Sequence, residues 1–155
     1  MASGGAYRRP ALAWAFVPAY AAHILEEWYG GFPEWFAVVA GGPMDRGSFL
    51  ALNLIGLAAM AAGVAAGVRY VSLGWMIVAV ATAALLNSFA HIAASVVTAS
   101  YSPGLVTGAA LWLPLAHLVL VRAYAQTRTS YFAGGVLAGL GAHAVVTLAA
   151  VAAGR

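Results

Sequence analysis

Residues 71–99, VSLGWMIVAVATAALLNSFAHIAASVVTA, contain no aspartate, glutamate, lysine or arginine. The stretch is longer than the roughly 20 apolar residues that a helix needs to cross the hydrocarbon core of a bilayer. A soluble domain has about a quarter of its residues charged, whereas 7% of this 155-residue chain is charged and 64% is apolar. The stretch and the composition together predict an all-α integral membrane protein.

Four further stretches are also long and apolar enough to cross a bilayer, so we expect a five-helix transmembrane bundle that forms a single domain over residues 1–155. The expected helices run at about 10–29, 47–68, 71–99, 103–123 and 131–153. The first is read as a retained helix, because it ends in Glu26, Glu27 and Trp28 without a small-residue cleavage site.

A short interfacial segment is expected after the first helix. Residues 30–42 are apolar for an external loop and are bracketed by glycine pairs. The segment is interpreted either as a lid over the outer mouth of the bundle or as an aromatic anchor in the headgroup layer.

The arginines predict the orientation of the bundle. With the N-terminus in the cytoplasm, five arginines lie inside and two outside, in the direction of the positive-inside rule. The five are Arg8, Arg9, Arg69, Arg122 and Arg128, and the two are Arg46 and Arg155. Their scatter fits membrane-flanking anchors better than a nucleic-acid surface, and no nucleic-acid partner is expected. The absence of cysteine excludes disulfides and thiolate metal sites.

Ionisable side chains at membrane depth point to an internal site. A charged side chain in the hydrocarbon costs at least about 2.5–3.5 kcal/mol, so such groups should face inward and meet one another. His23 and Glu27 are four residues apart and share one helical face, with Glu26 at its edge. On the third helix Asn87 and His91 are likewise four residues apart.

The candidate site draws on most of the helices. The candidate catalytic residues are His23, Glu26, Glu27, Asn87 and His91. The candidate metal ligands are His23, Glu27, His91, His117 and His143, and the candidate pocket residues are Tyr20, Asn53, Phe89 and Trp112. Mixed imidazole and carboxylate ligands suit a divalent cation such as zinc, iron or manganese. The alternative is a site without any cofactor.

Three segments carry a resemblance to a known family. His23-Ile24-Leu25-Glu26-Glu27 resembles the motif of the small bacterial membrane proteins named for HXXEE, and residues 87–91 (NSFAH) and 101–107 (YSPGLVT) are similar to later features of that family. The resemblance implies an integral protein of the bacterial inner membrane. It does not name a chemistry.

Two classes of function fit this pattern. The first is an intramembrane enzyme that acts on a lipophilic small molecule, either through a metal or by acid–base isomerisation or cyclisation; an oxidoreductase is a further form of the metal version. The second is a non-enzymatic metal or proton carrier, or a lipid-binding membrane protein. A homo-oligomer is compatible with both. Metal analysis of the purified protein and flux measurements in proteoliposomes would separate them.

Overall fold

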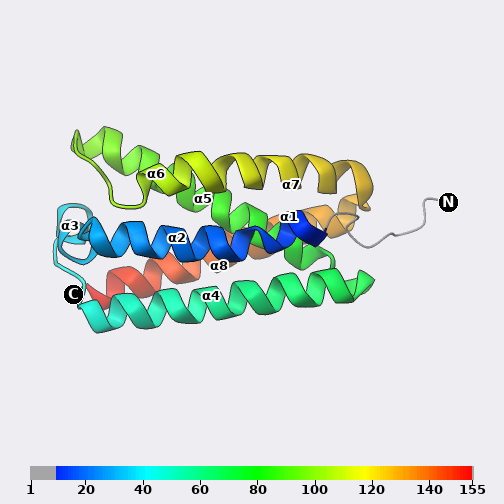
Figure 1. The fold of residues 1–155 in the computed structure, drawn as a ribbon, viewed down its shortest axis with the longest axis horizontal. Helices are drawn as coiled ribbons and strands as arrows, with labels where there is room; N and C mark the ends of the chain where they lie inside the picture. The colour runs from blue at the N-terminus through cyan, green and yellow to red at the C-terminus, as the bar shows by residue number, and fades with distance from the viewer. Residues whose placement is uncertain (1–9, 155) are drawn as a thin grey trace.

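The computed structural model describes residues 10–154, which form helices and turns and, within that range, no β-strand. The long helices run roughly along one axis, and α3 lies at the same end as the C-terminus (Figure 1). Arg8, Arg9 and Arg155, which contribute to the predicted orientation, lie outside the described residues. The all-α prediction is confirmed.

Four helical segments are long and apolar enough to cross a membrane. Two of them are the single helices α4 (Arg46–Arg69) and α8 (Thr129–Ala153). The 3₁₀ turn η1 (Val71–Leu73) and α5 (Trp75–Thr98) form another. The remaining segment combines α6 (Leu105–Thr107), the π-helical turn η2 (Gly108–Trp112) and α7 (Leu113–Gln126). All four lie within a few residues of the predicted stretches.

The first predicted helix is broken into α1 (Pro10–Trp14) and α2 (Phe16–Tyr29). Pro18 explains the break, because proline has no backbone N–H to donate to the carbonyl of Trp14. Helical hydrogen bonds are present on both sides of this gap: the N–H of Ala15 donates to the carbonyl of Ala11, and the N–H of Ala19 donates to the carbonyl of Ala15. The two pieces follow one another as one rod beside α4 and α7 (Figure 1).

The predicted segment after the first helix folds as α3 (Phe32–Ala40). Glycines in the left-handed region flank it, with φ of 75° at Gly31 and 82° at Gly41. Pro33 occupies the first turn, where the missing N–H costs nothing. The next helix, α4, begins at Asp45, whose side chain accepts a hydrogen bond of 2.7 Å from the N–H of Ser48.

Helices α5 and α8 pack closely because α8 presents glycines to α5. A Cβ atom added at Gly135 would lie 2.5 Å from Cβ of Val78, and one at Gly139 would lie 2.6 Å from the carbonyl oxygen of Ala79. Close approach through small residues is typical of membrane helices. The packing fixes α8 against α5, which carries two of the site residues.

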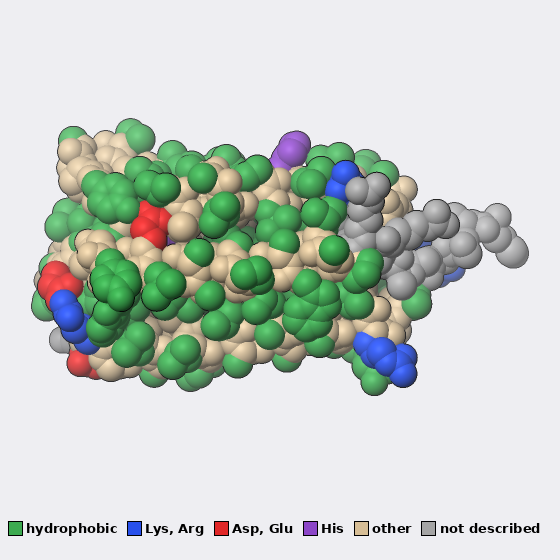
Figure 2. All heavy atoms as spheres, in the orientation of Figure 1, with side chains coloured by type: hydrophobic (Ala, Val, Ile, Leu, Met, Phe, Trp, Pro, Cys, Tyr) green, Lys and Arg blue, Asp and Glu red, His purple; other side chains and the backbone are tan. Residues whose placement is uncertain are grey.

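Apolar side chains cover most of the surface visible in Figure 2, and charged side chains lie toward its two ends. The main core cluster also consists of aromatic and aliphatic residues, among them Phe16, Val64, Ile77, Ala81 and Val119. Apolar surface outside and apolar core inside are expected where lipid surrounds the helices.

Candidate functional site

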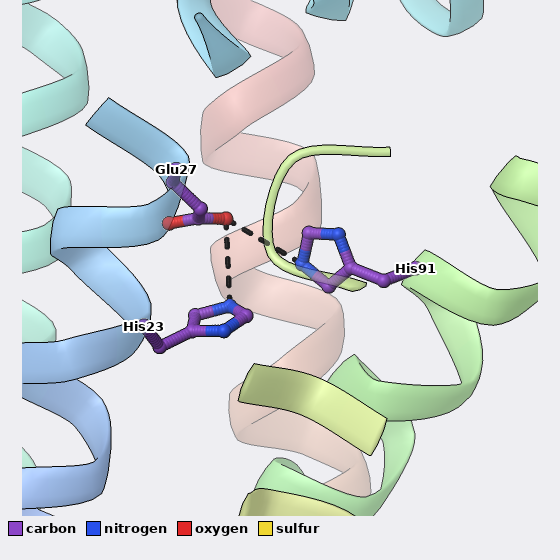
Figure 3. A group of neighbouring side chains, drawn as sticks. All are labelled: His23, Glu27 and His91. Atoms are coloured by element: carbon purple, nitrogen blue, oxygen red, sulfur yellow. Dashed lines mark ion pairs between the residues drawn. The ribbon is translucent and has the colours of Figure 1, made fainter. Parts of the chain in front are cut away.

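Three buried ionisable side chains converge from α2 and α5. Oε1 of Glu27 lies 3.5 Å from Nε2 of His23 and 3.5 Å from Nε2 of His91 (Figure 3). The three residues are between 1% and 6% exposed, and their ligand atoms all lie within 4.8 Å of one another. We call His23, Glu27 and His91 the histidine–glutamate cluster. The i, i+4 spacing predicted that His23 and Glu27 share a face, and His91, a candidate ligand from the third predicted helix, meets them from α5.

Each imidazole of the cluster is held through its other nitrogen. Nδ1 of His23 lies 2.7 Å from Oγ1 of Thr107, and Nδ1 of His91 lies 3.0 Å from Oγ of Ser102. When Nδ1–H donates to these hydroxyl groups, each Nε2 carries a lone pair that faces Glu27. Metal-binding histidines in proteins are oriented by the same kind of contact.

Further contacts fix the ring of His23. Nδ2 of Asn87 lies 3.0 Å from Nε2 of His23. The indole of Trp112 stacks on the imidazole, with ring centroids 4.4 Å apart and an interplanar angle of 24°. Trp112 comes from the π-helical turn η2, and single π-helical turns are frequent at functional sites.

Gly104 lies directly against both imidazoles. An added Cβ would be 2.6 Å from Cε1 of His91 and 2.8 Å from Cε1 of His23. Its φ of 101° is also a conformation that side-chain-bearing residues rarely adopt. A glycine is therefore required here for two independent reasons.

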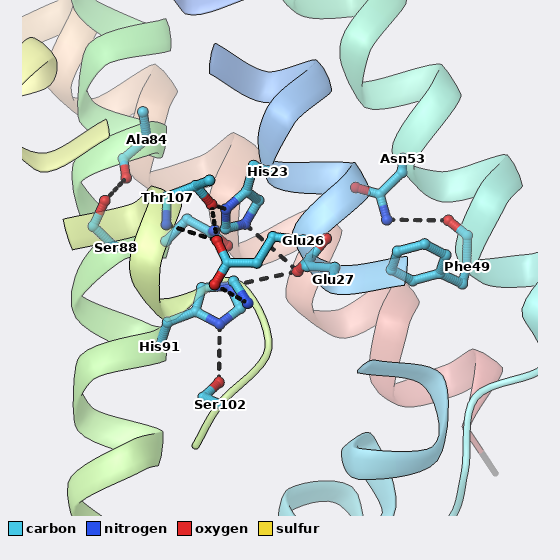
Figure 4. Close-up of polar contacts among 12 residues, drawn as sticks. His23, Glu26, Glu27, Phe49, Asn53, Ala84, Ser88, His91, Ser102 and Thr107 are labelled. Atoms are coloured by element: carbon cyan, nitrogen blue, oxygen red, sulfur yellow. Dashed lines mark hydrogen bonds and ion pairs between the residues drawn. The ribbon is translucent and has the colours of Figure 1, made fainter. Parts of the chain in front are cut away.

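Glu26 has a different role from its neighbour Glu27. Its carboxylate accepts hydrogen bonds from the backbone N–H groups of Gly104, Val106 and Thr107, at 3.2, 2.8 and 2.6 Å, where the α6 segment begins. Figure 4 shows Glu26 beside Thr107. The hydroxyl groups of Tyr101, at 2.5 Å, and of Thr107 also donate to it. An anion is favourable at a helix N-terminus, so Glu26 serves as a cap supplied from α2.

The Glu26 cap also connects to the histidine–glutamate cluster. The hydroxyl of Thr107 donates to Glu26 and accepts from Nδ1–H of His23. The hydroxyl of the loop residue Tyr101 completes the cap by donating to Glu26. Burial and then this hydrogen bond raise the pKa of Tyr101 from its usual 10 to about 12, so the phenol stays a donor well above neutral pH.

A cavity of about 220 Å³ opens beside the cluster. Glu27 and both cluster histidines line it, and aromatic residues form much of the remaining wall. The aromatic wall residues are Tyr20, Phe32, Trp35, Phe36, Phe49 and Trp112. Three of them, Phe32, Trp35 and Phe36, belong to α3, so α3 covers one side of the cavity. Ligand sites in proteins are of this kind, mostly apolar with a few converging polar groups.

Several further predicted residues line the same cavity. They are Tyr20, Asn53, Asn87, Trp112 and His143. His143 is half-buried and is not one of the three clustered ligands. The amide of Asn53 donates to the carbonyl of Phe49 at 3.1 Å. All five residues form part of the cavity wall, and Asn87 also contacts His23 of the cluster.

Three predicted residues lie elsewhere. His117 is exposed on α7, one position after the buried Ala116, so it faces away from the bundle interior. Phe89 is 51% exposed on α5 and does not line the cavity, because it lies two positions, or about 200°, from His91 around that helix. Glu26 was expected among the catalytic groups but is occupied as a helix cap, outside the cavity wall.

Ser102, Gly104 and Thr107 are site residues that the candidate set does not include. All three lie in the stretch 101–107, which the sequence marks only through its family resemblance. The Pro103-Gly104 pair at the very start of the predicted 103–123 span was the available indication, since a turn there leaves free backbone N–H groups at membrane depth.

One ion pair lies outside the predicted spans, at the end of the molecule that carries α3. Nη2 and Nε of Arg46 donate to Oε1 of Glu34 at 2.7 and 3.0 Å. These hydrogen bonds lower the pKa of Glu34 below its usual value of 4.5. Arg46 also lies over the ring of Trp28, 5.1 Å from its centroid. The pair joins α3 to the start of α4.

The comparisons with known proteins give a family and no further relative. A family model described as "Protein of unknown function with HXXEE motif" matches residues 14–119. No curated protein and no solved structure matches the chain. The matched range contains all three cluster residues together with Ser102, Gly104 and Thr107.

Proposed function

The chain belongs to the family of proteins of unknown function with the HXXEE motif, and we propose that it is an intramembrane enzyme that acts on a lipophilic small molecule through a divalent cation held by His23, Glu27 and His91. The observation that carries this proposal is the geometry of the histidine–glutamate cluster at the wall of an apolar cavity.

The distances from Glu27 to the two histidines are compatible with a shared cation. Protein hydrogen bonds between nitrogen and oxygen measure about 2.7–3.2 Å, and both contacts of Glu27 with the histidines are 3.5 Å. Two ligand atoms at about 2.0–2.1 Å from a tetrahedral zinc ion lie about 3.3 Å apart. The spacing of Glu27 from both imidazoles is close to this ligand–ligand separation.

The ligand set also fits catalysis. Two histidines and one carboxylate leave an open coordination position, as catalytic zinc sites and non-haem iron sites do. A zinc, iron or manganese ion would there supply a Lewis acid or an activated water. Thr107 and Ser102 orient the two imidazoles, and a substrate that fills the mostly apolar cavity beside Glu27 would displace water from the reacting groups.

A second candidate is acid–base catalysis without a metal, and Asn87 favours it. Its Nδ2 lies 3.0 Å from Nε2 of His23, where a hydrogen bond uses the lone pair that a cation would need. In this version Glu27 and His91 exchange a proton with a carbon centre of the substrate, which would support isomerisation or cyclisation. If the Asn87 amide were rotated by 180°, its oxygen, an acceptor, would face Nε2 of His23 in place of the NH₂ donor.

The setting of this enzyme is also a proposal. We place α1 and α2 together as a fifth span with the N-terminus in the cytoplasm, and the protein in a bacterial inner membrane. In this placement α3 lies at the outer mouth as a lid over the cavity. Lateral access from the surrounding lipid would suit a lipophilic substrate.

The decisive experiment is metal analysis of protein purified in detergent, with matched variants. Wild type is expected to carry about one divalent cation per chain. Glu27→Gln and His91→Ala should lose it. Glu34→Gln and His117→Ala should retain it, because these controls remove the same side-chain types at exposed positions.

Three results would change the proposal. If the folded wild type contains no metal and binds no added zinc, iron or manganese, the metal version is refuted and acid–base catalysis is favoured. Equal metal content in Glu27→Gln and Glu34→Gln would refute the cluster as the ligand set. Cation flux into proteoliposomes would favour a carrier.

A further inference from the structure

A second cavity, also of about 220 Å³, adjoins the one beside the histidine–glutamate cluster. The two cavities share wall residues from α2, α5, η2 and α8, which indicates that they meet. The shared residues are Tyr20, Asn87, Trp112, His143 and Val146. We call the second cavity the inner chamber.

The inner chamber is lined almost entirely by small and apolar residues. Beyond the shared residues its wall consists of Gly56, Ala59, Met60, Ala79, Val80, Ala83, Ala84 and Ala142. None of these eight side chains offers a hydrogen bond donor. An apolar cavity of about 150 Å³ is large enough to bind benzene, so the inner chamber has room for a larger hydrocarbon group.

Trp112, which lines both cavities, carries a buried polar atom without a partner. Trp112 is 4% exposed, and its Nε1 has no hydrogen bond partner among the described residues. A buried donor left unsatisfied costs about 1–3 kcal/mol.

We propose that the substrate is an amphiphile with one hydrocarbon chain, whose oxygen-bearing head binds at the histidine–glutamate cluster and whose chain occupies the inner chamber. This inference rests on the proposed function and names its substrate class. The succession of groups along the cavities supports it. Ionisable and aromatic residues line the first cavity, Trp112 lines both cavities, and small or apolar residues without a hydrogen bond donor line the rest of the second.

The chamber also has a route to the lipid. Ala59 of α4 and Val146 of α8 both line it and both are exposed, which indicates an opening between these two helices. A chain longer than the chamber would continue through this opening into the bilayer. Moving a chain from lipid into the chamber gains little hydrophobic energy, so the chamber selects the shape of the chain while the head supplies affinity.

Photo-crosslinking in lipid nanodiscs tests the proposal. The probe is a medium-chain fatty acid with a diazirine near its methyl end, and the crosslinked residues are mapped by mass spectrometry. We expect crosslinks to Met60, Val80 and Ala83, which disappear when an excess of the unlabelled fatty acid is added. Crosslinks confined to lipid-facing residues, or unchanged by the unlabelled acid, would overturn the proposal.

Two substitutions on α5 provide a matched pair. Ala83→Phe fills the inner chamber and should abolish the competed crosslinks. Ala93→Phe adds the same ring at an exposed position that lines neither cavity, and should leave them unchanged. Persistence of the crosslinks in folded Ala83→Phe would refute the assignment. Competition in wild type keeps the test decisive if Ala83→Phe does not fold.

Metal content measured on the same samples separates the two proposals. Competed crosslinks in a protein that binds no metal would retain the chain-binding chamber and remove the metal version of the proposed function. Bound metal without competed crosslinks would retain the metal centre and remove the amphiphile as its substrate.

Discussion

Replacing Gly104 by alanine should displace the two cluster histidines, and it should thereby lower both the stability of the protein and its affinity for a cation. The added Cβ would lie 2.6 Å from Cε1 of His91 and 2.8 Å from Cε1 of His23. Both carbon atoms are neighbours of the Nε2 atoms that face Glu27. The imidazoles must therefore move aside, and the histidine–glutamate cluster must spread.

The expected magnitude has two parts. Placing alanine in a left-handed conformation costs roughly 1–2 kcal/mol, and crowding a well-packed site costs about 1–3 kcal/mol. Gly104→Ala should thus lower the free energy of unfolding by about 2–5 kcal/mol. Since the crowding acts on the ligands themselves, cation affinity should fall about tenfold to a hundredfold.

Gly41→Ala isolates the backbone part. Gly41 has a φ of 82°, and an added Cβ would meet nothing within 4 Å. The assays are titration with sodium dodecyl sulfate for stability and competition with a fluorescent zinc chelator for affinity. Gly104→Ala should be less stable than Gly41→Ala and should bind zinc more weakly. Equal stability and equal affinity in the two variants would refute the reasoning.

Three further predictions concern neighbouring groups. Glu26→Gln should lower the free energy of unfolding by about 2–4 kcal/mol, because it weakens charge-assisted hydrogen bonds at the start of α6; unchanged stability on detergent titration would contradict the cap. Asn87→Ala should alter zinc affinity about tenfold, measured by chelator competition, whereas an unchanged affinity would show that the amide does not act on His23. Glu34 has a lowered pKa when folded, so its contribution is present above pH 4.5 and is lost as the pH falls through the folded value. Wild type should therefore lose slightly more stability than Glu34→Gln on acidification below about pH 4.5, by a small amount because both partners are exposed; parallel pH profiles would remove this contribution.

Most of the helical framework can be predicted from hydropathy alone, because a span must be long and apolar whatever its partners are. The stretch 47–68 predicted α4 (Arg46–Arg69), and 131–153 predicted α8 (Thr129–Ala153). The break at Ala15 was not predicted, although Pro18 offered a reason for it. Hydropathy predicts the length of an apolar helix more readily than the place where its backbone hydrogen bonds are interrupted.

The site was only partly predictable for a related reason. Helical spacing placed His23 with Glu27 because both lie on one regular helix. His117 was assigned only because it is an ionisable side chain at membrane depth, with no partner at helical spacing to fix its face, and it lies one position, or about 100°, from the buried Ala116. The different roles of Glu26 and Glu27 depend on backbone N–H groups near Gly104, and no periodicity reports those.

The Glu26 cap has a consequence for how the protein is made. The first helix leaves the ribosome long before Tyr101, Gly104 and Thr107, which supply the donors to Glu26 and the hydroxyl that holds His23. Until that later stretch arrives, the two adjacent carboxylates must wait in or near the bilayer without their final partners. The histidine–glutamate cluster and the Glu26 cap can therefore form only after the stretch 101–107, which follows α5, has been synthesised. A chain truncated before residue 107 should be unable to form either of them.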